Sequence, residues 1–338
     1  MTSERYILAT GTALPGEPIG NDVLSNRFGI NETWVENFIG TRTRHFAVDL
    51  GTGQVTHTLT DLGAQAAAAA MAAAGIEPWE IDFVVLGTAT PDELMPATVN
   101  RIADRLGIDQ VPTYQLQSGC AGAIQALDVA TRLLDDEHET GLVIGADICA
   151  KHLVVDRAAP GVAPAQLVNY VLFGDGAGAV VLTNKPTPGA MRVHRVLNRF
   201  TGLGQEPGQV IRWFGLADRH SDLPAFEEDY KAIEQRVPGL ARETLLETLE
   251  QTGWHLTRPD FLLPPQLSGR MTQHIVKGLG MDGATEISCV ADTGNNGNAL
   301  PFLQLDLLAQ RIKPGQRAVA VAIESSKWIK GGFTVEAI

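Results

Sequence analysis

Residues 116–134 read LQSGCAGAIQALDVATRLL. Gly119 precedes Cys120, small residues follow the cysteine, and an apolar pattern with helical spacing continues to Leu134. The pattern predicts a buried helix with Cys120 at its N-terminus. Unpaired N–H groups and the positive end of the helix dipole stabilise a thiolate at such a position and lower the thiol pKa. The stretch therefore predicts a nucleophilic Cys120, with a buried structural cysteine as the alternative.

Apolar runs bounded by turn residues lie on both sides of this stretch, and they are too short for helices. They predict buried strands at DFVVLGTA (82–89), TGLVIGAD (140–147), GAVVLTN (178–184) and QRAVAVAIE (316–324). Between them, helical patterns cover residues 60–74, 97–106, 120–135, 226–251, 267–279 and 298–311. This alternation of strands and helices predicts an α/β fold.

A helix, a buried strand, a short helix, a site-bearing turn and another helix follow each other twice, with the buried strands at 82–89 and 259–263. The chain has 338 residues, which exceeds the size at which one core usually stops growing. We interpret the chain as two duplicated α/β halves, residues 1–187 with Cys120 and residues 188–338 with Asn295. The joint is expected in the Pro- and Gly-rich run NKPTPGAM (184–191).

The composition is that of a globular protein, with 44% hydrophobic and 19% charged residues. A net charge of −13 argues against general affinity for nucleic acid or anionic membranes. No apolar run approaches the 18 residues of a membrane span, and no basic start with an apolar leader is present, so we expect a cytoplasmic protein. Three cysteines support neither a disulfide framework nor a zinc site, and Cys149 and Cys289 are interpreted as packing residues.

A second cluster, ADTGNNGNALPFLQLDLL (291–308), makes a tight turn into a helix. Asn and Gly dominate turns, so structure alone accounts for most of these residues. A buried Asn amide can also donate a hydrogen bond to a carbonyl oxygen on which negative charge develops. Asn295 is therefore a candidate site residue.

Taken together, the clusters resemble the ketoacyl-ACP synthase III family of the thiolase fold. The resemblance covers nearly the whole chain and rests on WVENFIGTRTRHFA (34–47), LGTATPD (86–92), GCAGAIQAL (119–127), FGDGAGAVVL (173–182), LLPPQ (262–266), TGNNGNA (293–299) and IKPGQ (312–316). It implies a five-layered αβαβα core, a homodimer, and an acyl group loaded on Cys120. No cofactor is implied, because the acyl-phosphopantetheine or CoA thioester is the substrate. It further implies that Asn295 lies in the site and that Met95 reaches into the acyl pocket of the neighbouring subunit.

The resemblance breaks at two catalytic positions. Relatives carry a catalytic His in a V-P-H-Q-like stretch, and here Pro265 occupies that place. The C-terminal Gly-rich loop is rewritten as IESSKWIKGG (323–332), in which Ser325 is the nearest match for an oxyanion-hole N–H. His274 follows Pro265 by nine residues, roughly 13 Å along a helix, which is too far to replace the imidazole. Of the other histidines, His220 in the aperiodic segment 199–224 is the least implausible substitute, and that segment is expected to cover the substrate.

Partner binding is predicted from one helix face and one N-terminal segment. Arg270, His274 and Lys277 fall at i, i+4 and i+7 and form a basic stripe that matches the carrier-protein docking positions of relatives, with a solvated helix face as the alternative. Trp34 matches a residue that stacks on CoA adenine, whereas Phe38 replaces the neighbouring Arg. An acyl carrier protein is therefore favoured as the acyl donor over acyl-CoA.

The leading prediction is a non-standard synthase-III-like acyltransferase of polyketide or specialised metabolism. Cys120 accepts an acyl group and passes it to a second substrate without malonyl decarboxylation, since one of the two donors that assist decarboxylation is missing. A β-ketoacyl acceptor, as in tetronate-type ring formation, needs no decarboxylation because its α carbon is already acidic. The alternatives are a catalytically silent subunit that binds an active homologue or carrier protein and, least favoured, standard fatty-acid initiation.

Overall fold

A computed structural model describes residues 4–153, 164–212 and 226–338. Ten strands join into one mixed sheet in the order β12-β11-β13-β14-β8-β1-β7-β6-β4-β5. Their bounds are β1 Tyr6–Ala13, β4 Phe83–Thr88, β5 Thr113–Gln117, β6 Thr140–Asp147, β7 Gly176–Thr183, β8 Met191–Phe200, β11 Phe261–Leu263, β12 Thr285–Glu286, β13 Arg317–Glu324 and β14 Ile329–Ala337. Two small ribbons add β2 Ile19–Gly20 with β3 Thr43–Arg44, and β9 Gln209–Ile211 with β10 Phe226–Glu228.

The sheet order repeats itself about its centre. Outward from β1 the strands are β7, β6, β4 and β5, and outward from β8 they are β14, β13, β11 and β12, so equivalent strands occupy equivalent places. The two sets meet where Tyr6 and Ile7 pair with Arg192 and Met191. This order is what two copies of one α/β unit would give, and the exact division between residues 187 and 188 stays a prediction.

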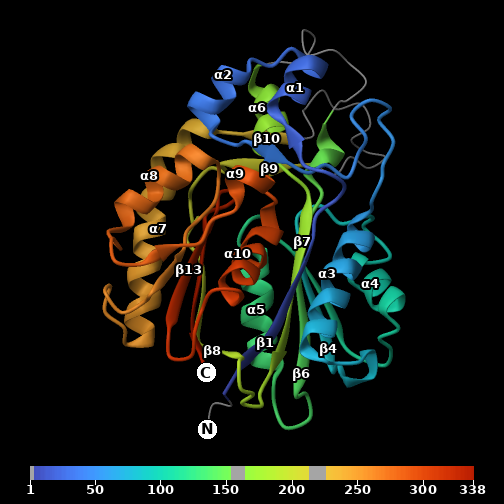
Figure 1. The fold of residues 1–338 in the computed structure, drawn as a ribbon, viewed down its shortest axis with the longest axis vertical. Helices are drawn as coiled ribbons and strands as arrows, with labels where there is room; N and C mark the ends of the chain where they lie inside the picture. The colour runs from blue at the N-terminus through green and yellow to red at the C-terminus, as the bar shows by residue number, and fades with distance from the viewer. Residues whose placement is uncertain (1–3, 154–163, 213–225) are drawn as a thin grey trace.

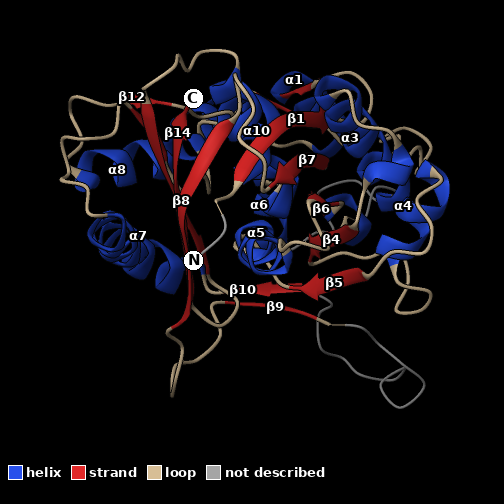
Figure 2. Ribbon diagram, turned by 90° about the horizontal axis from the view of Figure 1, so that it is seen from below, coloured by secondary structure: helices blue, strands red, loops and turns tan. Residues whose placement is uncertain are grey.

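The helices form three layers around the two halves of the sheet (Figures 1 and 2). In Figure 1, α3 and α4 cover one outer face, α7 and α8 cover the opposite outer face, and α5 and α10 lie between the sheet halves. This is the predicted five-layered αβαβα core. The α-helices are α1 Asn21–Phe28, α2 Glu32–Trp34, α3 Leu59–Ala74, α4 Thr98–Leu106, α5 Gly122–Leu133, α6 Pro164–Leu172, α7 Tyr230–Thr252, α8 Gly269–Leu279, α9 Val290–Thr293 and α10 Leu300–Ala309.

Short helical turns complete the described elements: η1 Val35–Ile39, η2 Pro78–Glu80, η3 Cys149–His152 and η6 Gly297–Ala299. The central strands are buried along their whole length, as β4 and β7 show, because helices cover both of their faces. No helix in the described ranges combines the length and apolar character that a membrane span requires.

The predicted helix at 226–251 is wrong at its start. Residues 226–228 form β10, and α7 begins only at Tyr230 because the Asp229 side chain accepts a hydrogen bond from the backbone N–H of Ala232. An Asp at this position is a helix N-cap, so the start signal was present in the sequence. The ribbon of β9 and β10, near α6 in Figure 1, was not predicted.

Candidate active site

The turn that carries Cys120 joins the end of β5 to the start of α5. The N–H of Gly122 donates to the carbonyl of Gly119 at 2.7 Å, which places Cys120 two residues before the first helical residue. A Cβ atom at Gly122 would lie 2.3 Å from Oδ1 of Asn298, so only glycine allows this close approach. The predicted position of Cys120 at a buried helix N-terminus is confirmed.

Asp147, at the end of β6, fixes the loops beneath the cysteine. One carboxylate oxygen accepts hydrogen bonds from the side chains of Thr88 and Thr90 and from the N–H of Ala89, at 2.8–3.1 Å. The other accepts both the backbone N–H and the side-chain amide of Asn298 at 2.8 Å. The same Asn298 amide donates to the carbonyl of Ser118, two residues before Cys120. Asp147 therefore ties the turn at Cys120 to the turn at 295–299.

Glu324 holds the same turn from the C-terminal half. Its carboxylate accepts hydrogen bonds from the hydroxyls of Ser118 and Ser326, one on each oxygen. A Cβ atom at Gly119 would lie 3.2 Å from the Glu324 side chain, so this carboxylate packs directly on the cysteine turn. Both oxygens of this buried group are thus occupied by protein donors.

The electrostatics of Cys120 correct the sequence prediction. Burial raises the pKa of the Cys120 thiol, and three carboxylates raise it further: Glu324, Asp147 and Glu228. The helix dipole was expected to lower this pKa, but the surrounding negative charge and the loss of solvent outweigh it. Cys120 therefore needs a proton acceptor before it can act as a nucleophile.

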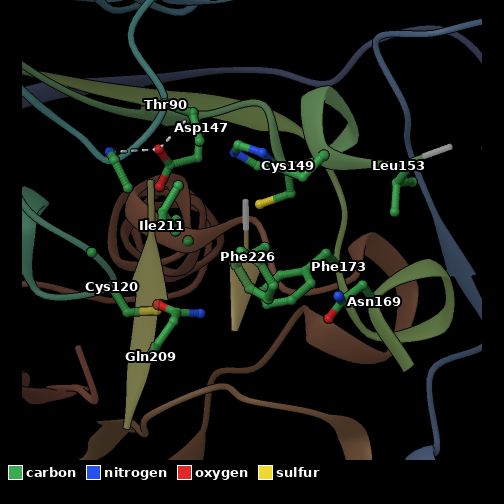
Figure 3. A pocket seen from close by; sticks show the side chains of 14 residues that line it. Thr90, Cys120, Asp147, Cys149, Leu153, Asn169, Phe173, Gln209, Ile211 and Phe226 are labelled. Carbon is green, nitrogen blue, oxygen red and sulfur yellow. Dashed lines mark hydrogen bonds between the residues drawn. The ribbon is translucent and has the colours of Figure 1, made fainter. Parts of the chain in front are cut away.

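Two hollows meet at Cys120. The wide cavity, about 340 Å³, is lined by Cys120 together with Phe38, Asn295, Ser325, Glu228, Met271 and further residues of α6, α7 and α8. The narrow pocket, about 30 Å³, is lined by Cys120 with Thr90, Cys149, His152, Asn169, Phe173, Ile211 and Phe226 among others (Figure 3). Phe173 and Gln209 line both hollows, so the thiol lies where they join.

Asn295 is buried and lines the wide cavity, as its prediction as a site residue requires. Its backbone is fixed by hydrogen bonds to the carbonyl of Leu172 and from the N–H of Gly174. Its side-chain Oδ1 accepts the N–H of Gly297 at 3.1 Å, while none of the hydrogen bonds among the described residues uses Nδ2. The amide N–H₂ is thus the end of the side chain available to a ligand.

Pro265 lies beside the cysteine. It is buried and lines, with Cys120, a further hollow of about 20 Å³. Proline brings no side-chain donor or acceptor, and the neighbouring Gln266 spends its Oε1 on the N–H groups of Cys289 and Val290 at 2.7 Å each. The position at which relatives carry an imidazole therefore offers no side-chain acid, base or hydrogen-bonding group.

Residues 114–198 match the sequence model of the family described as 3-oxoacyl-[acyl-carrier-protein (ACP)] synthase III. The beta-ketoacyl-[acyl-carrier-protein] synthase III of Rhodospirillum rubrum is 32% identical over 97% of this chain and 96% of its own length. The corresponding protein of Neisseria meningitidis serogroup B is 30% identical over 98% of this chain and 97% of its own length. The chain belongs to the ketoacyl-ACP synthase III family.

Solved structures of synthase III relatives share the fold. The chain superposes on AbyA1, described as a tetronic acid condensing enzyme, with a TM-score of 0.95 and 52% identity, covering 98% of this chain and 99% of that one. It superposes on the synthase III of Pseudomonas aeruginosa PAO1 with a TM-score of 0.84 and 25% identity, covering 98% of each chain. The predicted thiolase-like fold is confirmed.

The residues predicted from the synthase III resemblance fall into two groups. Asn295, Ser325 and Phe38 line the wide cavity with Cys120. Trp34 packs half-buried against the N-terminal core and Met95 is 85% exposed, and neither lines the hollows around Cys120. The role of Met95 at a partner's pocket stays a prediction, and His220 lies outside the described residues.

The basic stripe of this synthase III relative is exposed on α8, as its helical spacing predicts. Arg270, His274 and Lys277 are all exposed, and Arg270 packs on Gly40 next to the end of η1. The adjacent Met271 lines the wide cavity, which brings the stripe close to that cavity. Whether a carrier protein docks there stays a prediction.

Two further residues, Cys149 and Glu228, line the hollows at Cys120 although the sequence did not predict it. Cys149 was interpreted as a packing residue, but it lines the narrow pocket beside Cys120, and burial raises its pKa. Glu228 was assigned to a helix, but it ends β10 and lines the wide cavity. The only sequence signal for Glu228 is the N-cap Asp229 that follows it, because the β9–β10 ribbon is too short for a clear period.

Proposed function

We propose that the protein is a condensing acyltransferase in which Cys120 takes an acyl group from a thioester and passes it to a carbon nucleophile without decarboxylation. The observation that carries the proposal is the cysteine at the junction of an open cavity and a pocket, with proline where relatives hold the decarboxylation histidine. A packed site around Cys120 would have favoured a silent subunit. The 340 Å³ cavity favours an enzyme.

The proposed substrates are a small acyl thioester and a β-ketoacyl thioester. A tetronic acid ring forms when the α carbon of a β-ketoacyl thioester attacks the carbonyl of a 2-hydroxyacyl unit and the hydroxyl then closes on the remaining thioester. The similarity to a protein described as a tetronic acid condensing enzyme supports this reaction class. The narrow pocket supports a small unit on Cys120, because its volume of about 30 Å³ is less than a tenth of the 340 Å³ of the wide cavity.

In this proposal the oxyanions that form on the thioester carbonyls are stabilised by Asn295 Nδ2 and by the backbone N–H groups of Cys120 and Ser325. Asn295 and Ser325 line the cavity with Cys120, which supports the assignment. The exposed stripe of Arg270, His274 and Lys277 would dock an acidic carrier protein, whose phosphopantetheine arm enters the wide cavity. A homodimer in which Met95 contributes to the partner's acyl pocket completes the proposal.

The test is intact-mass analysis after incubation with 2-hydroxyacyl thioesters of CoA and of a carrier protein. An acyl adduct should form on the wild type and be absent from Cys120→Ala, and adding a β-ketoacyl thioester should discharge it into product. Malonyl-carrier protein should not discharge it. If no thioester labels the wild type and Cys120 resists alkylation near neutral pH, the silent subunit becomes the better reading.

A further inference from the structure

Glu228 is a buried carboxylate with one free oxygen. Its Oε1 accepts a hydrogen bond from the side-chain amide of Gln209 at 2.6 Å. Its Oε2 is buried and accepts no hydrogen bond of good geometry in the part of the chain that the structure describes. The neighbouring Tyr230 hydroxyl donates to Asn169 Oδ1 at 2.8 Å, and its proximity favours the charged form of Glu228. Burying a charged oxygen without a hydrogen-bond partner is unfavourable, so such groups call for an explanation.

The ribbon of β9 and β10 aims this carboxylate into the wide cavity. Glu228 pairs with Gln209 across the ribbon, and both residues line the cavity with Cys120. The preceding Glu227 is exposed and forms an ion pair with Arg212, as expected because successive side chains of a strand point to opposite faces. Of these two adjacent carboxylates, Glu227 therefore lies at the surface and Glu228 lines the wide cavity.

The other buried carboxylates near Cys120 are occupied by protein donors, and the histidine near it lines the narrow pocket and not the wide cavity. Asp147 accepts five hydrogen bonds, and both oxygens of Glu324 accept serine hydroxyls. His152 lines the narrow pocket and stacks on Phe226, with ring centroids 6.0 Å apart. Pro265 contributes no titratable group. Glu234 also lines the wide cavity but is exposed to solvent, so Glu228 is the carboxylate there that keeps a buried oxygen free.

We propose that Glu228 is the proton carrier of both half-reactions at Cys120, in place of a histidine. This inference rests on the proposed function and assigns the group that function requires.

In the first half-reaction the Glu228 carboxylate takes the proton of the Cys120 thiol. The thiolate attacks the acyl thioester, the carbon–sulfur bond to the donor breaks, and the departing donor thiolate receives the proton from the Glu228 carboxylic acid. In the second half-reaction the carboxylate takes an α proton from the β-ketoacyl thioester. The resulting enolate forms a carbon–carbon bond to the acyl carbonyl, the bond to Cys120 breaks, and the Cys120 thiolate is reprotonated by Glu228. Each half-reaction returns the carboxylate to its starting state.

The electrostatics of Glu228 suit this exchange. Burial raises its pKa to about 7, against the effect of Tyr230 and Gln209 beside it, which favour the charged form. A proton carrier works best when its pKa lies near the working pH. The other titratable groups that face the cavity are Cys120, Tyr230 and Glu234, and burial raises the pKa values of Cys120 and Tyr230 well above that range.

The first experiment compares Glu228→Gln with the matched control Glu227→Gln, which changes the adjacent carboxylate on the opposite face. In rapid-quench measurements of Cys120 acylation, Glu228→Gln should slow the reaction about 10²–10⁴-fold, the usual contribution of a general acid–base group. Glu227→Gln should acylate at the wild-type rate. The wild-type rate should rise with pH through a limb near 7, and this limb should be absent from Glu228→Gln and retained in Glu228→Asp.

The second experiment isolates the carbon-acid step. In deuterated water, Cys120→Ala should exchange the α proton of a β-ketoacyl thioester faster than the uncatalysed background, and Cys120→Ala with Glu228→Gln should fall to the background. Thermal unfolding run in parallel should show that Glu228→Gln folds, since it removes an unpaired buried charge.

Each result decides one claim. If the wild type acylates Cys120 and Glu228→Gln does so at the same rate with the same pH limb, the role of Glu228 is overturned while the proposed function stands. Equal deuterium exchange with and without Glu228 also overturns it. If the wild type never acylates, the proposed function itself fails.

Discussion

The carboxylates beneath Cys120 and the carboxylate across the wide cavity from it are built differently. Asp147 and Glu324 have all their oxygens occupied by donors from several segments of the chain. Glu228 in the wide cavity keeps one oxygen free, and Pro265, which lines another hollow at Cys120, offers no polar side chain. The saturated region, around Asp147 and Glu324, fixes the geometry of Cys120. The unsaturated region, around Glu228, has an oxygen available to a ligand. Side chains of this second region can therefore be substituted without disturbing the position of Cys120.

The largest effect is expected from Cys120 itself. Cys120→Ala should abolish the acyl-enzyme adduct and turnover, because Cys120 is the one cysteine of the described residues that lines both hollows, whereas Cys149 lines only the narrow pocket. Cys289→Ala is the matched control, since Cys289 is buried against Gln266 and lines none of the hollows at Cys120. Intact-mass spectrometry with a 2-hydroxyacyl thioester measures both. An adduct that persists in Cys120→Ala would show that another residue is the nucleophile.

Substitutions in the saturated region should lower the free energy of unfolding. Asp147→Ala leaves donors from Thr88, Ala89, Thr90 and Asn298 without their acceptor, and we expect a loss of about 3–5 kcal/mol in the free energy of unfolding. Urea denaturation at fixed pH measures it. Glu93→Ala, which removes an exposed ion pair with Arg101, should change stability by about 0.5 kcal/mol or less. Equal effects of the two variants would remove the distinction between the regions.

Asn295 should affect rate more than stability. Asn295→Asp keeps the oxygen that accepts the Gly297 N–H but loses the N–H₂ donor, so acylation should slow about 10²–10³-fold, the usual cost of one oxyanion donor. Single-turnover acylation, together with a melting curve, separates the two effects. An Asp variant that acylates at the wild-type rate would reduce Asn295 to a turn residue.

The smallest effect is expected at the basic stripe. Reversing charge at Arg270 and Lys277 should raise KM for an acyl carrier protein about tenfold, because exposed charges at an interface act mainly on encounter. KM for an acyl-pantetheine without the carrier protein should not change. The same double change at Arg101 and Arg105, exposed on α4, is the control. If carrier-protein transfer is unaffected by the α8 variant, the stripe is a solvated helix face.

The strength of the local patterns explains what could be predicted. The strand at 140–147 was predicted with its observed bounds, and α3 to within one residue, because long apolar runs between turn residues leave few alternatives. The start of α7 was misplaced by four residues, since the three-residue strand β10 carries too few side chains for a period. The dipole argument for Cys120 used only local sequence, whereas the carboxylates that raise its pKa come from residues 147, 228 and 324.

The sequence by itself determined the family, the α/β alternation, the cysteine at a helix start, the candidate Asn295 and the proline in place of histidine. These are local patterns or motifs, and each is complete within a few residues of the chain. The tertiary structure alone decided that Asp147 and Glu324 are saturated, that Glu228 faces the thiol's cavity with a free oxygen, and that the thiol pKa is raised. Burial and charge at Cys120 depend on residues 147, 228 and 324, which come from separate segments of the chain, and only folding brings them together.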